Sequence, residues 1–318
     1  MKHKSLTKSI TYTDFKKEIL NDYKTIVISR DTSLLGRKEV LGGKAKFGIF
    51  GDGKELPQIA MAKAFKKGDH RSGYYRDQTF MLALNEITVQ QIFSALYGNT
   101  NLNKEPMSGG RQMGSHFMTN YLDEKGNFID TTNKYNSSAD ISPTSGQMPR
   151  LLGLSMASKL YREGSFVSKN FSNDGNEVAW GTIGNASTSE GPFFEVFNAA
   201  GVHQVPMIIS VWDDEYGISV DNSYQTTKSS ISEALKGFKR DEGKLNGYEI
   251  IKVKGWDYPK LISAYEHAAN ICRSKHIPVL VHVTELTQPI GHSTSGSHER
   301  YKDKKRLDWE RICLQLMN

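Results

Sequence analysis

Two apolar runs in this sequence end in polar residues whose oxygens suit a metal ion. The run AWGTIG is followed by Asn185, and the run PMIISVW is followed by Asp213 and Asp214. In a parallel sheet, ligands bind beyond the carboxyl ends of the strands, which meet at one edge. Asn185 and Asp214 would then each offer an oxygen to one cation. Hard oxygen ligands beside a phosphate suit Mg²⁺, which is commonly held by one or two protein ligands, phosphate and water.

The residues around Asn185 add a place for that phosphate. Gly184, Ala186 and Ser187 belong to a loop of small residues that runs into a helix, and the free N–H groups of a helix N-terminus favour phosphate. The same stretch also fits a polar helix cap followed by a turn, and its residues alone do not separate the two interpretations. The sequence has no Gly-x-x-x-x-Gly-Lys-Ser/Thr loop, which argues against a P-loop ATPase.

A Gly-Asp-Gly sequence elsewhere in the chain competes for the role of phosphate loop. Gly51, Asp52 and Gly53 follow KAKFGIF, which makes a poor buried strand, and HRSGYYRD interrupts the path to a second strand. We therefore interpret these three residues as a turn at the surface.

The elements around these residues alternate between helix and strand. Apolar residues recur at helical spacing in residues 55–67, 88–98, 147–164, 192–202 and 258–275, and buried strands are expected at 177–183, 206–212 and 278–286. Strand, helix and strand at this spacing form crossover units. The sequence therefore predicts an α/β fold in which helices flank a parallel sheet.

Residues 99–146 show little periodicity and are rich in Gly, Asn, Ser and Asp. A stretch of this length without regular structure is either a disordered linker or a set of ordered binding loops. Both interpretations remain open at this point.

Composition limits the class of protein. The chain has 318 residues, 37% of them hydrophobic, and a net charge of +6 from scattered basic residues, which indicates a solvated surface rather than a nucleic-acid site. No apolar stretch approaches the roughly 20 residues of a membrane helix, and the basic start lacks the apolar core of a signal peptide. The two cysteines, Cys272 and Cys313, lack the spacing of a metal site or a disulfide framework. We expect a reduced, cytoplasmic protein that binds neither membrane nor nucleic acid.

The stretch GNASTSEG, followed by HQVPMIISVWDDEYGIS, resembles the thiamine-diphosphate motif of the alpha-type decarboxylating components of 2-oxoacid dehydrogenase complexes. That motif usually reads Gly-Asp-Gly-Ala-x-Ser-Glu-Gly and then a pair of asparagines before x-Tyr. The resemblance implies a thiamine-diphosphate-binding fold in which Asn185, Asp214 and the carbonyl of Tyr216 hold Mg²⁺. Because Asp and Asn are exchanged, one formal charge is kept while an amide replaces a carboxylate. We therefore expect weakened metal binding, and tighter binding when Asn185 is replaced by Asp.

Other segments extend the resemblance over about residues 45–310. SGYYRDQTFMLAL places Tyr74, Tyr75 and Arg76 at the diphosphate, where a phenol and a guanidinium both donate to phosphate oxygens. Without the resemblance, we would interpret Arg76 and Asp77 as a surface ion pair.

Two further segments, SGGRQMGSHFMTN and ADISPTSGQMPRLLG, resemble loops of the family that contact the cofactor. The resemblance implies that Ser142 and Thr144 contact the thiamine portion, and that Gln147 lines a structural cation site found in some members. By itself, SPTSGQMP predicts only an N-cap before a helix.

The segment TQPIGHSTSGSHERYKDK resembles the Gly-His-Ser loop of the family and implies that His292 lies near the reacting carbon. An imidazole can donate or accept a proton near neutral pH. His116 is a second catalytic candidate, on the substrate side.

The resemblance also implies an activity and partners. The cofactor serves as an electron sink while a 2-oxo acid loses CO₂, and the acyl group then passes to the lipoyl group of an acyltransferase component. The glutamate that activates the cofactor lies on a beta-type chain in this family, so the chain looks like half an active site. We therefore expect an oligomer that contains a beta-type chain or a fused beta half. The sequence GRQM is closer to the branched-chain members of the family, which favours a branched-chain substrate.

Residues 1–44 are expected to form a partly helical extension, and residues 45–318 the thiamine-diphosphate-binding domain. Alternatives are a degenerate, non-catalytic relative, a pyruvate- or acetoin-type subunit, and an unrelated basic module that binds nucleic acid. Because larger relatives fuse the beta part after a region like the last residues, a fragment of a fused alpha–beta form is a further interpretation.

Overall fold

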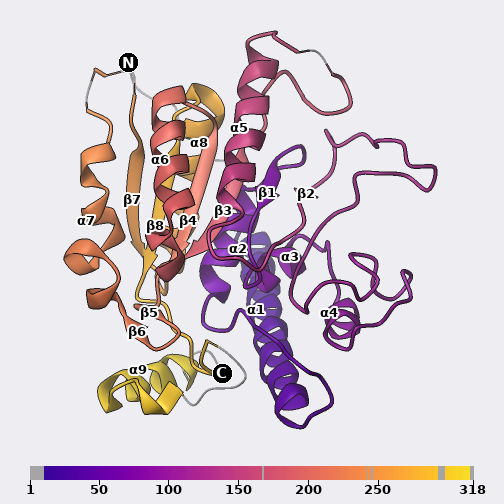
Figure 1. The fold of residues 1–318 in the computed structure, drawn as a ribbon, viewed down its shortest axis with the longest axis vertical. Coiled ribbons are helices and arrows are strands. Elements are labelled where there is room, and N and C mark those ends of the chain that lie inside the picture. The colour runs from indigo at the N-terminus through magenta and orange to yellow at the C-terminus, as the bar shows by residue number, and fades with distance from the viewer. Residues whose placement is uncertain (1–10, 167, 242, 245, 293–297, 316–318) are drawn as a thin grey trace.

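A six-stranded parallel sheet forms the centre of the computed structural model (Figure 1), which describes residues 11–292 and 298–315 except 167, 242 and 245. The strand order is β2-β1-β3-β4-β8-β7. The strands are β1 (His70–Ser72), β2 (Asn136–Ser137), β3 (Ala179–Gly184), β4 (Met207–Trp212), β7 (Glu249–Lys254) and β8 (Val279–Thr284). Part of the predicted Gly-His-Ser loop, residues 293–297, lies outside the described residues. The predicted α/β fold with a parallel sheet is confirmed.

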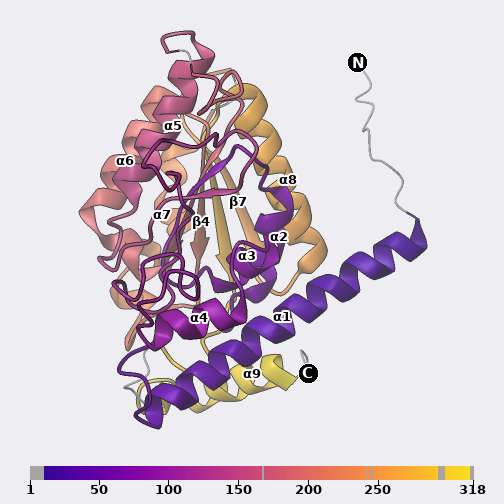
Figure 2. The ribbon, with the colours of Figure 1, turned by 90° about the vertical axis from the view of Figure 1, so that its right-hand side faces the viewer.

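Helices cover both faces of this sheet, as Figure 2 shows. One face packs against α2 (Glu55–Ala64) and α8 (Tyr258–Lys275), and the other against α5 (Met148–Arg162) and α6 (Gly191–His203). Successive strand residues alternate between the two cores: Ile208 and Trp212 of β4 lie in the first, and Ile209 and Val211 in the second. This alternation follows from the two-residue period of a strand. It makes nearly every residue of the central strands apolar.

The remaining helices lie around this core. They are α1 (Tyr12–Leu41), α3 (Gln78–Ala83), α4 (Val89–Leu96), α7 (Ile231–Ala234) and α9 (Lys304–Gln315). Helix α1 occupies most of the expected N-terminal extension, and its buried Ser29 accepts a hydrogen bond from Gln78 of α3. The proposed boundary at residue 44 stays a prediction.

Most predicted elements are present within a few residues of their expected bounds. The predicted helix at 258–275 coincides with α8, which begins after the capping residue Asp257. Residues 99–146 adopt ordered loops that include β2, so the disordered-linker interpretation is wrong. Periodicity does not predict β1, which is only three residues long, or β7, an edge strand.

None of the helices in the described part of the chain combines the length and the apolar composition that crossing a membrane requires. Cys272 and Cys313 are both free thiols.

Candidate functional site

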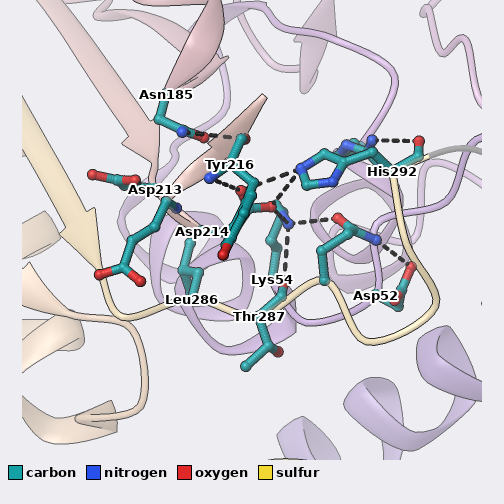
Figure 3. A network of polar contacts seen from close by, with 12 residues as sticks. Asp52, Lys54, Asn185, Asp213, Asp214, Tyr216, Leu286, Thr287 and His292 are labelled. Carbon is teal, nitrogen blue, oxygen red and sulfur yellow. Dashed lines mark hydrogen bonds and ion pairs between the residues drawn. The ribbon is translucent and has the colours of Figure 1, made fainter. Parts of the chain in front are cut away.

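The carboxyl ends of β3, β4 and β8 bring the predicted metal residues together. The backbone N–H of Asn185 donates to the carbonyl of Trp212 at 3.4 Å, and that of Asp213 donates to the carbonyl of Val283 at 2.9 Å. The strand pairing thus continues one residue beyond β3 and β4. Asn185 and Asp214 consequently lie at the same edge of the sheet (Figure 3).

Asp214 is the centre of a buried polar network. Its carboxylate accepts from Lys54 Nζ at 2.8 Å, from the backbone N–H of Tyr216 at 3.2 Å and from His292 Nε2 at 3.2 Å. Burial alone would raise the pKa of this carboxyl, but His292 and Lys54 outweigh it and hold the pKa of Asp214 well below its usual range. Asp214 is therefore an anion that two elements far away in the sequence already contact.

Lys54 is a residue of this network that analysis of the sequence missed. Its ammonium is buried and also donates to the carbonyl of Thr287 at 3.1 Å and to Gln288 Oε1 at 2.6 Å. These three acceptors match the three protons of an ammonium group. The sequence carries a weak signal at most, since a lysine before a helix is usually solvated.

The interpretation of residues 51–53 as a surface turn is wrong. They do form a turn, but Asp52 is fully buried and accepts from Gln288 Nε2 at 2.7 Å and from the backbone N–H of Ile290 at 3.2 Å. Burial raises the pKa of Asp52 to about 6. A Cβ on Gly51 would collide with the carbonyl of Arg76, and a Cβ on Gly53 with the carbonyl of Thr287. The glycines thus permit close backbone packing.

The side chain of Asn185 is buried and its direction is defined. Its Nδ2 donates to the carbonyl of Tyr216 at 3.2 Å and to Asn222 Oδ1 at 2.9 Å. Because both acceptors are oxygens, Nδ2 of Asn185 is held between Tyr216 and Asn222. Asn222 was missed by analysis of the sequence, which shows only an asparagine in a polar loop.

Arg76 is buried and holds two loops together. Its guanidinium donates to the carbonyl of Phe50 at 2.6 Å and to the carbonyl of His292 at 2.8 Å. The alternative of an Arg76–Asp77 surface pair is wrong, because Asp77 is buried and pairs with Arg71 at 2.6 Å. Arg76 therefore positions the backbone of His292.

Other predicted residues form two separate sets of contacts. Tyr75 packs against the ring of Tyr74 at a centroid distance of 5.0 Å and against the ring of His116 at 6.0 Å, and His116 Nε2 lies 2.9 Å from Ser142 Oγ. Thr144 is exposed and donates instead to Glu190 at 2.9 Å.

The loop after β3 was expected to run directly into a helix, but a turn of 3-10 helix comes first. Ala186 and Ser187 lie in a turn of 3-10 helix, η1 (Ala186–Ser189), which precedes α6. Gln147 donates to the carbonyl of Thr182 at 2.8 Å.

Three residues at this edge carry oxygens of the type that a divalent cation prefers, but the Asp214 carboxylate already accepts from Lys54 and the Tyr216 carbonyl from Asn185 Nδ2. The amide oxygen of Asn185, the carboxylate of Asp214 and the carbonyl of Tyr216 are hard oxygen ligands. Within the described residues, no group of three or more His, Cys, Asp or Glu side chains is placed to hold a metal. A cation at this edge would therefore depend on the amide and the carbonyl.

Two buried polar atoms beside these ligands lack a partner among the described residues. They are the hydroxyl of Tyr74 and Nδ1 of His292. A Cβ built on Gly184 would lie 3.8 Å from the Tyr74 hydroxyl, so the end of β3 is adjacent to it. Buried polar groups are normally satisfied. Within the described residues, these two atoms are therefore available to a polar ligand.

A family model described as Dehydrogenase E1 component matches residues 23–314. The 2-oxoisovalerate dehydrogenase subunit alpha of Bacillus subtilis (strain 168) is 26% identical over 297 residues, which are 92% of this chain and 77% of that protein. The 2-oxoisovalerate dehydrogenase subunit alpha 2, mitochondrial, of Arabidopsis thaliana is 26% identical over 84% of this chain and 48% of its own length. The pyruvate dehydrogenase E1 component subunit alpha of Acholeplasma laidlawii is 25% identical over 88% of this chain and 67% of its own length.

The family model covers most of the chain, which therefore belongs to the dehydrogenase E1 component family. The resemblance inferred from the sequence motifs is confirmed at this level.

Proposed function

We propose that this chain, as a member of the dehydrogenase E1 component family, is the alpha subunit of an enzyme that oxidatively decarboxylates a 2-oxo acid. It would use thiamine diphosphate and Mg²⁺ and pass the acyl group to a lipoyl domain. The observation that carries this proposal is the convergence of Asn185, Asp214 and Tyr216 at the carboxyl edge of the sheet, beside the unpartnered Tyr74 hydroxyl and His292 Nδ1.

In this proposal, Asn185, Asp214 and the Tyr216 carbonyl would hold Mg²⁺. The diphosphate would lie against Tyr74, Tyr75, Arg76, Gly184 and the turn at Ala186 and Ser187. Ser142 and Thr144 contact the thiamine portion; both are exposed, which suits contact with a ligand or a second chain. Lys54 adds a positive charge that favours an anionic ligand.

The bound cofactor supplies an electron sink for the decarboxylation. His292 is the proposed proton donor and acceptor, with its backbone held by Arg76 and its Nε2 on Asp214. Burial lowers the pKa of His292, Asp214 opposes this shift, and Arg76 and Lys54 add to it to a smaller extent. His116, hydrogen-bonded to Ser142, is the second candidate and lies on the side of Tyr75.

The proposed partners are a beta-type chain, or a fused beta half, and a lipoyl acyltransferase component. Relatives are named as alpha subunits, which supports a beta-type partner. The chain spans about half of the Arabidopsis relative and about three quarters of the Bacillus relative. A branched-chain 2-oxo acid is the proposed substrate, because the Bacillus and Arabidopsis relatives are named for 2-oxoisovalerate; pyruvate is the alternative. A cytoplasmic location stays a prediction.

One observation favours a second candidate function, a non-catalytic relative with weak cofactor binding. The Lys54 ammonium lies 2.8 Å from the Asp214 carboxylate, so a cation at Asp214 would meet a like charge. In this alternative, Lys54 takes the place of Mg²⁺.

A thiamine-diphosphate titration followed by tryptophan fluorescence separates the two candidates, since Trp212 adjoins Asp213. Saturable binding that requires Mg²⁺ is the expected result. Absence of binding at any cofactor concentration would support the non-catalytic relative. Binding that is unaffected by Mg²⁺ would contradict the proposed metal ligands.

A further inference from the structure

A cavity of about 310 Å³ lies at the edge of the sheet opposite the proposed site. It is bounded by the starts of β1 and β3, by the second half of α5 and by the loop of residues 121–131. His70 pairs with Ala179 at the first position of these two strands, and both residues line the cavity. Asn185 follows the last residue of β3, whose six residues span roughly 20 Å at about 3.3 Å per residue. The cavity and the proposed site are therefore separate.

Aromatic and aliphatic side chains form most of the wall of this cavity. They include Tyr121, Phe128, Leu154, Tyr161, Phe171 and Val178. The rings of Phe128 and Phe171 pack edge to face at a centroid distance of 5.4 Å, and Phe128 is exposed to solvent. An apolar cavity of about 150 Å³ is large enough to bind benzene. About twice that volume suits a molecule with two fused rings.

The charges of the wall favour an uncharged ligand. Among the described residues that line the cavity, Glu177 is the one acid, and none is a lysine or an arginine. The Glu177 carboxylate already accepts from Ser172 Oγ at 2.9 Å and from the backbone N–H of Asn173. Burial lowers the pKa of His70 to about 4, so its imidazole is uncharged at pH 7. An anionic ligand would therefore meet a carboxylate here and no positive charge.

Two polar atoms of the wall residues lack a hydrogen-bond partner among the described residues. They are Nδ1 of His70 and the hydroxyl of Tyr121, whose rings stack at a centroid distance of 6.3 Å. Thr119 lies near Tyr121, but the Thr119 hydroxyl accepts from the backbone N–H of Ser137 at 2.8 Å and donates to the Ser137 carbonyl at 3.3 Å. Buried polar groups are normally satisfied. A ligand with a hydroxyl or a ring N–H would supply the partner.

We propose that this cavity binds a small, uncharged, two-ring aromatic molecule that carries one hydroxyl or ring N–H group. The aromatic side chains of the wall pack on its rings, and its polar group pairs with His70 or Tyr121. Bound there, the molecule contacts both α5 and the loop of residues 121–131 and holds them together. The inference does not depend on the proposed function, because the cavity lies at the opposite edge of the sheet.

Titration of the full chain with 2-naphthol tests the ligand class, and the fluorescence of this probe follows its binding. 2-Naphthol should bind saturably to one site per chain. Naphthalene has the same rings but no hydroxyl, and in competition it should bind about tenfold more weakly, which corresponds to the loss of about one hydrogen bond. 2-Naphthoate is an anion at pH 7 and should not compete. No binding of 2-naphthol, or equal affinity for 2-naphthoate, would overturn the proposal.

Substitutions in the wall locate the bound probe. Ala157→Phe fills the cavity from α5 and should weaken the binding of 2-naphthol at least about tenfold. Gly153→Phe is the matched control, because it adds the same side chain to an exposed position of α5 where a Cβ meets nothing within 4 Å. His70→Phe combined with Tyr121→Phe keeps both rings and should abolish the preference for 2-naphthol over naphthalene. Wild-type affinity in Ala157→Phe, or an unchanged preference in the double variant, would overturn the proposal.

Thermal melting of each variant without ligand checks folding. If Ala157→Phe unfolds, Ala157→Met replaces it, because methionine is a good helix former whose flexible side chain fills irregular space. Saturating thiamine diphosphate should leave the affinity for 2-naphthol within about twofold, since the cofactor is proposed to bind at the opposite edge of the sheet. Competition between the two would place 2-naphthol at the proposed site and overturn the inference.

Discussion

The contact between Lys54 and Asp214 is the most consequential pair of residues in the site. Both side chains are about 2% exposed, and the ammonium lies 2.8 Å from the carboxylate. A buried ion pair contributes little net stability, but removing one partner typically costs about 3–5 kcal/mol because the other charge is left alone. Mg²⁺ and Lys54 would therefore compete for one carboxylate, or share it with a bound phosphate.

Replacing Lys54 with Met tests that competition. Lys54→Met should lower the melting temperature in the absence of cations, because Asp214 loses a partner. Mg²⁺ should then raise the melting temperature of this variant more than that of the wild type, since the cation no longer meets a like charge. Lys63→Met removes a lysine that pairs with Glu18 and Asp22 near the surface and serves as the control. An equal response to Mg²⁺ in all three proteins would show that Lys54 and the cation do not compete.

At the scale of elements, the loops rather than the strands determine which polar groups lie at the proposed site. The turn at residues 51–54 packs on the loop after β8, through Asp52 on Ile290 and Lys54 on Thr287. Gly53 makes this approach possible, because its φ is +82° and a side chain there would meet the Thr287 carbonyl. The edge of the sheet thus acquires a second layer of buried polar groups.

Gly53→Ala should separate these loops. A positive φ costs a non-glycine residue about 1–2 kcal/mol, and the collision with Thr287 adds to that cost. Gly43→Ala is the matched control, because φ is +76° there and a Cβ would meet nothing within 4 Å. We expect the urea midpoint to fall more for Gly53→Ala than for Gly43→Ala, and thiamine diphosphate to bind more weakly only to Gly53→Ala. Equal losses would mean that backbone strain alone matters.

The start of β1 makes the stability of the fold depend on pH. Burial lowers the pKa of His70 to about 4, although Asp69 opposes the shift. The ordinary histidine pKa is about 6.5, so between pH 6.5 and about 4 the unfolded chain binds a proton that the folded chain does not. The free energy of unfolding should therefore fall by up to about 3 kcal/mol as the pH drops through this window.

His70→Phe removes the titrating group and keeps a ring to stack on Tyr121, which lies at a centroid distance of 6.3 Å. Urea unfolding at pH 7, 6, 5 and 4 should show a shallower loss of stability for this variant than for the wild type. His267→Gln on the exposed face of α8 is the control and should retain the wild-type slope. A wild-type slope in His70→Phe would assign the pH dependence to other groups.

At the scale of the whole molecule, the proposed active site is half a site. The described chain would supply the proposed metal ligands, the proposed phosphate-facing groups and two histidines, while the resemblance places the glutamate that activates the cofactor on a beta-type chain. The relatives that match this chain are named as alpha subunits, which agrees with this division. The isolated chain should therefore bind thiamine diphosphate without turning over a 2-oxo acid, whereas the assembled enzyme should do both.

We expect the purified chain alone to release no CO₂ from 2-oxoisovalerate or pyruvate, even when saturated with thiamine diphosphate and Mg²⁺. Adding a beta-type chain should restore turnover, measured as CO₂ release with an artificial electron acceptor. The assembled enzyme carrying Asp214→Ala is the negative control. Steady turnover by the chain alone would contradict the half-site proposal.

The sequence predicts most helices and strands of this protein, but it does not predict the contacts between residues far apart in the chain. Helix α8 was predicted at its observed bounds, because an apolar stripe at helical spacing follows the capping residue Asp257. Strand β1 was missed, since its three residues include Arg71, whose charge is buried against Asp77 and Asp140. Periodicity cannot reveal a buried charge, because its partners lie elsewhere in the chain.

The sequence by itself determined the parallel α/β sheet, the family and the edge at which Asn185 and Asp214 meet. Each depends on local apolar patterns and on motif spacing, which are properties of the sequence alone. Only the tertiary structure placed Lys54 on Asp214, across 160 positions of sequence, and Asn222 between Asn185 and Asp213. A hydrogen bond requires its atoms to lie within about 3 Å, and that distance depends on the path of the whole chain rather than on neighbouring residues. The residues that set the charge and the direction of the proposed ligands therefore become visible only in three dimensions.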